Sequence, residues 1–115
     1  MASNFVYCIF CETSLEKNVE TFLKGLGYNV ISALVERNIV KNGKQIKELR
    51  SIIPGYVFFE CDFELDWSSW KEINNFNSIY YPLHYSNREK ILKDNDLLFV
   101  KWLKRNNGII KVSKA

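Results

Sequence analysis

Histidine and cysteine are scarce in this sequence, which has one histidine and three cysteines among its 115 residues. Three cysteines leave one unpaired in any disulfide scheme, so a reducing compartment is favoured over a disulfide framework. Cys8 and Cys11 form a C-x-x-C pattern, but they lie in an apolar run typical of a strand, where positions three apart point to opposite faces. Because no second ligand pair occurs and His84 is solitary, we expect core cysteines, no metal and no cofactor.

Long hydrophobic runs are also missing. No segment approaches the roughly 18 apolar residues that a membrane-spanning helix needs. The uncharged start, Met1–Asn4, leads into an apolar run that Glu12 interrupts, which is unlike a signal peptide. We expect a cytoplasmic protein without a membrane function. With 47% hydrophobic residues, scattered glycines and no repeat or linker, the chain predicts one domain with its own core.

Motifs that carry catalysis are lacking as well. An enzyme needs a nucleophile with a neighbouring base, or two acids held apart in a cleft. Gly-x-Ser-x-Gly, His-Glu-x-x-His and glycine-rich phosphate loops do not occur. The acids between Glu60 and Asp66 alternate as they do on the solvent face of a strand. We expect no enzyme activity; any turnover would depend on Cys11 or His84.

The residues that are present alternate between strand-like and helix-like segments. Phe5–Cys11 is short, aromatic and β-branched, which predicts a strand buried on both faces. Thr13 and Glu16 have capping-box spacing, and apolar residues recur at helical intervals up to Gly27, a helix stop. A strand and an amphipathic helix therefore open the domain.

The middle of the chain predicts a hairpin and then another strand. Tyr28–Val40 has strand composition, and Asn42-Gly43 favours a two-residue turn that returns the chain through Leu49. Pro54-Gly55 interrupts the returning arm, so the next strand starts at Tyr56.

The last third predicts a short helix, a strand and a longer helix. Ser68 or Ser69 caps the short helix, and strand composition returns over Ile79–Tyr85.

The longer helix is predicted from Ser86 and Glu89, which again have capping-box spacing, to about residue 106 with an interruption at 94–96. Residues 109–112 predict either a final short strand or the start of a connection.

The order strand, helix, strand, strand, helix, strand is the split βαβ pattern. It predicts an α+β fold, namely a ferredoxin-like split β-α-β sandwich with an antiparallel sheet and helices packed mainly on one face. Many unrelated functions use this fold, so it does not choose one.

RNA-recognition domains share this topology and stack bases on aromatic residues of the central strands. Tyr7, Tyr56 and Phe58 would have that role here. The glycines and the basic residue of the RNA-recognition motif are missing at Pro54–Phe59. An RNA-binding ferredoxin-like domain that acts without a polymerase stays open as the alternative.

One segment resembles a known family signature. Ile53-Pro54-Gly55-Tyr56-Val57-Phe58 is similar to the Phe-Pro-Gly-Tyr-Val-Phe/Leu block of the NusG N-terminal domain. This block is the one specific motif, but the likeness covers nearly the whole chain. The order and spacing of the family's elements are also matched at residues 7–26, residues 41–49, Trp70, Ile73 and Ile79.

The resemblance implies a bacterial transcription elongation or antitermination factor that acts as a monomer. Such a domain binds the clamp helices of the largest RNA polymerase subunit through an apolar patch and bridges the cleft over the DNA. The competing interpretation is that the matching positions are only core residues. The predicted polymerase-binding residues are Phe10, Ile53, Pro54, Tyr56 and Phe58.

Departures from the family pattern point to a specialised paralog of the LoaP or RfaH kind. Val6 replaces a usual tryptophan, Ser14 replaces the turn glycine, and residues 80–85 lack the usual glycines. Since the family carries a KOW domain after a linker, we expect a NusG N-terminal-like domain over residues 1–108. Residues 109–115 would then start the linker toward a KOW domain that is absent from this sequence.

Charge is unevenly distributed although the formal net charge is only +3. Residues 60–72 hold five acids and one lysine, whereas residues 101–115 hold five basic residues and no acid. With the family's position beside exposed DNA and emerging RNA, this predicts phosphate contacts to an RNA hairpin or to single-stranded, non-template DNA. Lysines that only solubilise the surface are the alternative. The predicted contacts are Lys41, Lys44, Lys47 and Arg50 on the hairpin, and Lys101, Lys104 and Arg105 near the C-terminal helix.

Overall fold

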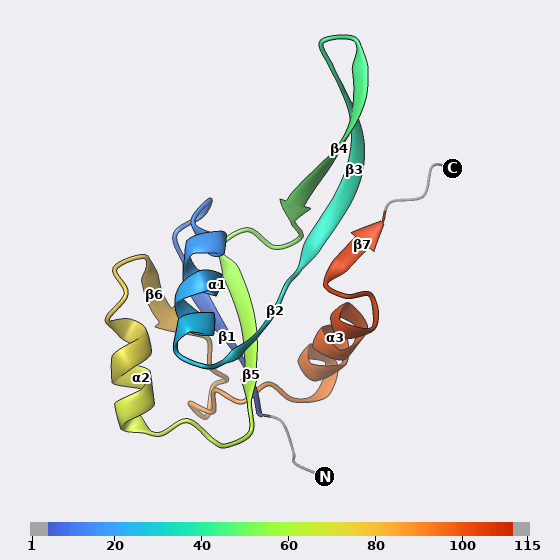
Figure 1. Ribbon diagram of the computed structural model, residues 1–115. Helices are drawn as coiled ribbons and strands as arrows, with labels where there is room; N and C mark the ends of the chain where they lie inside the picture. The colour runs from blue at the N-terminus through green and yellow to red at the C-terminus, as the bar shows by residue number, and fades with distance from the viewer. Residues whose placement is uncertain (1–4, 112–115) are drawn as a thin grey trace.

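A four-stranded antiparallel sheet is the centre of the fold in the computed structural model, which describes residues 5–111 (Figure 1). Its order is β2-β5-β1-β6, so the first strand of the chain lies inside the sheet. The predicted α+β fold with a ferredoxin-like antiparallel sheet is confirmed. The four strands are β1 (Phe5–Cys11), β2 (Asn29–Ile31), β5 (Tyr56–Cys61) and β6 (Ile79–Pro82).

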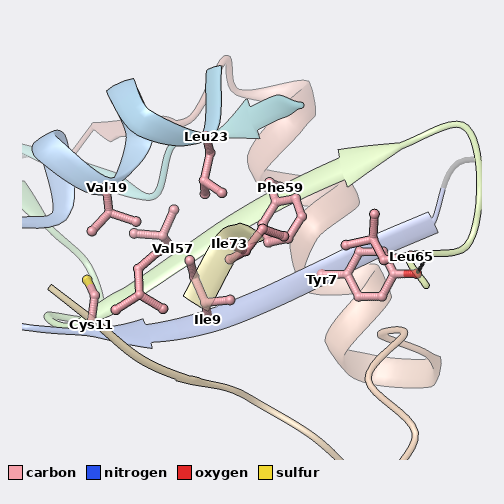
Figure 2. Packing of buried hydrophobic residues seen from close by; sticks show 10 residues of the cluster. Tyr7, Ile9, Cys11, Val19, Leu23, Val57, Phe59, Leu65 and Ile73 are labelled. Carbon is pink, nitrogen blue, oxygen red and sulfur yellow. Dashed lines mark hydrogen bonds between the residues drawn. The ribbon is translucent and has the colours of Figure 1, made fainter. Parts of the chain in front are cut away.

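Both faces of this sheet are covered by helices. On one face, α1 (Glu16–Gly25) and α2 (Trp67–Asn74) close a core around Ile9 and Phe59, whose side chains are fully buried (Figure 2). On the other face, α3 (Asp94–Arg105) closes a second, smaller core. Two of the three helices therefore share a face. No helix among the described residues is long and apolar enough to cross a membrane.

The start of α1 differs from the predicted capping box. Leu15 occupies the N-cap position and makes no side-chain cap hydrogen bond. The Glu16 carboxylate instead accepts a hydrogen bond of 2.8 Å from the backbone N–H of Gly55. The box fails because a long-range donor takes the carboxylate that Thr13 was expected to share. The predicted stop is confirmed, since Gly27 has a φ of +97°.

The N-cap of α2 was also predicted wrongly. Asp66, and not Ser68 or Ser69, is the N-cap residue, and its carboxylate accepts a 2.9 Å hydrogen bond from the backbone N–H of Ser69. That hydrogen bond lowers the pKa of Asp66 because it stabilises the ionised carboxylate. The aspartate competes better for this role because it is ionised at neutral pH.

A second, three-stranded sheet carries the predicted hairpin. The single strand expected over 28–40 is divided into β2 and β3 (Leu34–Lys41), which belong to different sheets. β3 pairs antiparallel with β4 (Lys44–Ser51) and parallel with β7 (Ile109–Lys111). Of the two interpretations for residues 109–112, the strand is therefore observed over 109–111. The rest of the predicted linker, residues 112–115, lies outside the described residues.

The hairpin projects from the body of the molecule (Figure 1), which measures 51 × 31 × 27 Å. Asn42 and Gly43 both have positive φ, 54° and 75°, as the predicted two-residue turn requires. Gly108, which connects α3 to β7, also has a positive φ of 75°. A Cβ atom there would lie 2.7 Å from the backbone oxygen of Ser32, so only glycine fits.

The helix expected from Ser86 begins only at Asp94. Before it, the chain runs along β1, where the backbone N–H of Leu83 donates to Cys8 and that of Leu92 donates to Val6. Ile91 packs against the first core and Leu92 lies in the second. Consecutive apolar residues that serve opposite faces need an extended backbone, which excludes the predicted first helical turns.

An ion pair holds the last turn of α3 on the sheet. The Lys104 ammonium donates to both carboxylate oxygens of Glu60 at 2.9 and 3.0 Å, and Asn29 donates a further 2.7 Å hydrogen bond. Glu60 is 5% exposed, whereas the Lys104 side chain is 41% exposed. The lysine therefore neutralises a buried charge from the protein surface.

We expect Lys104→Met to lower the free energy of unfolding by about 1–2 kcal/mol, less than for a fully buried pair because water screens the lysine. The double variant Glu60→Gln/Lys104→Met should lose clearly less than the sum of the single variants, since the uncompensated carboxylate is gone. Urea unfolding of the four proteins measures this coupling. Strictly additive losses would show that the two residues act independently.

Candidate functional site

A groove of about 540 Å³ lies between α3 and the sheet face that α3 covers. We call it the α3 groove. β1 and β5 form its floor, the turn before β5 and the segment 83–92 form its ends, and α3 forms one wall. It is lined by Cys8, Ile53, Tyr56, Phe58, Leu83, His84, Tyr85, Leu92, Asp96 and Phe99.

The Pro-Gly turn positions the residues that enter this groove. Gly55 has a φ of +87°, and a Cβ atom there would lie 3.3 Å from both the Cys11 backbone oxygen and the Phe10 ring. The Gly55 backbone oxygen accepts a 2.7 Å hydrogen bond from the Cys11 N–H. With the Glu16 contact to the Gly55 N–H, these bonds fasten the turn to β1 and α1. The glycine is required by this close approach and by its backbone conformation.

Strand alternation then divides β5 between the two cores. Val57 and Phe59 point to the α1 and α2 side, and Tyr56 and Phe58 point into the α3 groove. Phe58 is buried, whereas Tyr56 is half-buried. A ligand in the groove would therefore meet the Tyr56 ring more readily than the Phe58 ring.

The structure brings most of the predicted polymerase-binding residues together. Ile53, Tyr56 and Phe58 line the groove. Phe10 stands directly opposite Tyr56 in the β1–β5 register, with ring centroids 5.3 Å apart, so it extends the apolar surface beyond the groove lining. Pro54 is exposed and is not part of the lining. Its place in the turn before β5 gives it an indirect role in the shape of the groove.

Sequence reasoning did not predict three further apolar residues that line the groove. Leu83 and Leu92 come from the segment that was predicted to be partly helical, and Phe99 comes from α3. No periodic apolar pattern marked the two leucines, since residues 86–90 are polar and Leu92 directly follows Ile91. For Phe99, the signal was an aromatic residue at the edge of the apolar stripe of α3.

A hydrogen bond joins the segment 83–92 to the first turn of α3. The Tyr85 hydroxyl donates to the Asp96 carboxylate at 2.7 Å and accepts from the backbone N–H of Lys93 at 3.0 Å. Burial raises the pKa of Tyr85, and the neighbouring Asp96 carboxylate raises it further. The interior of the groove is thus apolar. Asp96 is the acidic group at its rim, and its carboxylate already accepts a hydrogen bond from Tyr85.

The basic residues of the hairpin lie on two faces. Lys41 and Lys44 stand opposite each other at the tip and so share a face. Arg50 is on that face but bonds to Glu48. Lys47 is on the other face, 3.6 Å from Glu36. Of the predicted hairpin residues, the tip pair is therefore the part that makes no ion pair within residues 5–111.

The three predicted basic residues of α3 also lie in two different environments. Lys104 is turned to the sheet by Glu60. Lys101 and Arg105 are exposed and make no ion pair within the described part of the chain. One turn separates Lys101 from Arg105, so they form a small cationic surface on the outside of the helix.

The C-x-x-C cysteines lie in separate cores, as their strand spacing predicted. Cys8 is in the core under α3 and Cys11 is in the core under α1 and α2. Burial raises the pKa of Cys8 to about 12 and that of Cys11 to about 11, so neither is a ready thiolate. Residues 5–111 contain no group of histidine, cysteine and acidic side chains that could hold a metal ion.

The aromatic residues considered for RNA stacking are not on one open surface. Tyr7 is 1% exposed, and its hydroxyl accepts a 2.9 Å hydrogen bond from the backbone N–H of Leu65 (Figure 2). Phe58 is buried on the opposite face. RNA-recognition domains use an uncovered sheet face for base stacking. Here helices cover both faces, so this arrangement does not favour that mode.

Comparisons with known proteins give a family. A search of curated proteins found no match. Residues 6–99, however, match the NusG family, which is described as "Transcription termination factor nusG". The matched span contains every residue that lines the α3 groove. The family consists of transcription factors and not of enzymes. The chain therefore belongs to the NusG family of transcription factors.

Proposed function

We propose that this domain is an elongation or antitermination module that docks its α3 groove on the clamp helices of the largest subunit of bacterial RNA polymerase. The observation that carries the proposal is the gathering of Ile53, Tyr56 and Phe58, from the family-like signature, in one apolar groove. NusG family factors generally bind RNA polymerase.

The shape and chemistry of the groove suit a helix. An amphipathic helix binds by laying its apolar face into a hydrophobic groove, with side chains one turn apart as anchors. The groove offers aromatic rings from Tyr56 on its floor and Phe99 on its α3 wall, and aliphatic ends from Ile53 and Leu83. Aromatic residues in such desolvated surfaces dominate binding energies. Phe10 widens the aromatic contact beside Tyr56.

The hairpin supports a second contact within the same proposal. Lys41 and Lys44 stand at the tip of an arm that projects from the body (Figure 1). Docking through the α3 groove leaves this arm free to reach phosphates of non-template DNA or of an RNA hairpin. In this proposal the protein is a monomeric, cytoplasmic, specialised paralog of the LoaP or RfaH kind. Its NusG N-terminal-like domain spans residues 1–108.

We expect Tyr56→Ala to weaken polymerase binding by about thirtyfold, because truncation of an aromatic anchor costs about 2 kcal/mol. Tyr56→Phe keeps the ring and should retain most of the affinity, so it is the matched control. Titration of labelled domain with purified RNA polymerase measures both, with circular dichroism to establish folding. A folded Tyr56→Ala variant that binds as tightly as wild type would refute groove docking. Tight RNA binding without any polymerase binding would favour the alternative function.

We expect Lys41→Gln/Lys44→Gln to weaken binding to nucleic acid and to flatten its salt dependence by roughly 0.7–0.9 in log-log slope per lost phosphate contact. Lys47→Gln is the control, since Lys47 lies on the other face and already has Glu36 beside it. Both are measured by titration with an RNA hairpin and with single-stranded DNA. Equal slopes for wild type and the double variant, or no binding even at about 50 mM salt, would remove the hairpin from the mechanism.

A further inference from the structure

The outer face of α3 carries a tryptophan that the polymerase-docking groove does not use. Trp102 is 41% exposed and is not among the residues that line the α3 groove. Leu98, one turn earlier on the same face, is 60% exposed. Large apolar side chains at two successive turns leave this face of the helix without a partner within the described residues. Such a face indicates an interaction surface.

The Trp102 ring is held in place from inside the molecule. Its centroid lies 5.9 Å from that of Phe99, which in turn contacts Phe58 of the second core. The Trp102 backbone oxygen accepts a 2.8 Å hydrogen bond from the side-chain amide of Asn106, which fixes the end of the helix. The ring therefore packs against a row of aromatic side chains. Because it is already held in place, its side chain would lose little conformational freedom on binding.

Two cations lie on the same exposed side of α3 as this ring. Lys101 precedes Trp102 and Arg105 lies one turn beyond Lys101, and neither has a carboxylate partner in residues 5–111. Lys104, by contrast, points to the sheet and neutralises Glu60. Lys101 and Arg105 are thus on the side of the helix that Trp102 occupies, whereas Lys104 is not. An exposed aromatic ring beside two cations complements a polyanion that exposes flat, unpaired rings.

We propose that Trp102, Lys101 and Arg105 form a stacking site for an unpaired nucleic-acid strand, in which the indole stacks on a base and the two cations contact phosphates. This inference rests on the nucleic-acid contact in the proposed function and deepens it. It adds Trp102 to the predicted nucleic-acid contacts and removes Lys104 from them. In a duplex, neighbouring bases cover both faces of each ring, so a single strand is the occupant. We expect DNA and RNA strands to bind alike, because the stacked base and the phosphates are common to both.

The test titrates the domain with fluorescein-labelled oligothymidylate, an oligouridylate of equal length, and a duplex of that length. Trp102→Ala should lower single-strand affinity about tenfold or more, as expected for one stacked base. The slope of log affinity against log salt should stay unchanged, because no phosphate contact is lost. Trp102→Phe should keep most of the affinity. Trp67→Ala, which removes an exposed tryptophan from α2 on the opposite face of the sheet, should have little effect.

Lys101→Gln/Arg105→Gln separates the two parts of the site. It should flatten the salt slope by roughly 0.7 for each lost phosphate contact on a single strand. Circular dichroism checks the fold of every variant, and Trp102→Phe keeps the test informative if Trp102→Ala does not fold.

Four results would overturn the site. In the first, Trp102→Ala binds single strands as tightly as wild type, while wild type still binds them. In the second, the duplex binds at least as tightly as the single strands. In the third, Trp102→Ala loses affinity only for purified RNA polymerase, which would make the occupant a protein. In the fourth, wild type binds no oligonucleotide, which would also remove the nucleic-acid part of the proposed function. Polymerase docking is judged separately through Tyr56.

Discussion

The packing of α3 on the second face of the central sheet is the constraint on which the groove depends. A sheet covered on one face only would leave Val6, Cys8 and Phe58 in water, and Val100 and Leu103 of α3 bury them. The ion pair from Lys104 to Glu60 fixes the far end of the helix, and the Tyr85 bond to Asp96 fixes its beginning. Between these two attachments a groove is left between the helix and β5, with Tyr56 on its floor and Phe99 on its α3 wall.

Local patterns in the sequence were sufficient wherever the determining contacts are local. Phe5–Cys11 was predicted with the observed bounds because strand composition lies in the segment itself, and the Asn42-Gly43 turn because positive φ favours those residues. The capping box of α1 failed because its partner is distant: Glu16 bonds to Gly55, 39 positions away. Lys104 was assigned to phosphate for the same reason, since Glu60 precedes it by 44 positions. The cap of α2 failed for a local reason, because Asp66 competes with the nearby serines and bonds to Ser69. Sequence reasoning found three lining residues of the groove and missed the wall built by Leu83, Leu92 and Phe99.

Burial divides the charged and aromatic residues into structural and available groups. Glu60 and Lys104 serve the fold, as do Tyr7 and Phe59 in the first core. The residues left at the surface include half-buried aromatics at the groove, the exposed Trp102, and cations at the hairpin tip and on the outer face of α3. The hairpin tip lies on β3 and β4, away from the groove, and on α3 the groove lining and the exposed cations lie on different faces of the helix. An apolar protein partner and an anionic strand can therefore occupy the domain together. This separation is what a factor that joins polymerase to nucleic acid requires.

Site-specific photo-cross-linking to purified RNA polymerase tests groove docking most directly. A photoreactive phenylalanine derivative at position 53 lies in the groove, and the same residue at position 24 lies on α1, which covers the opposite face of the sheet. Docking through the groove predicts a cross-link from position 53 to the clamp helices of the largest subunit and none from position 24. Cross-links to the polymerase from position 24 alone, or from position 53 to a different subunit, would contradict it.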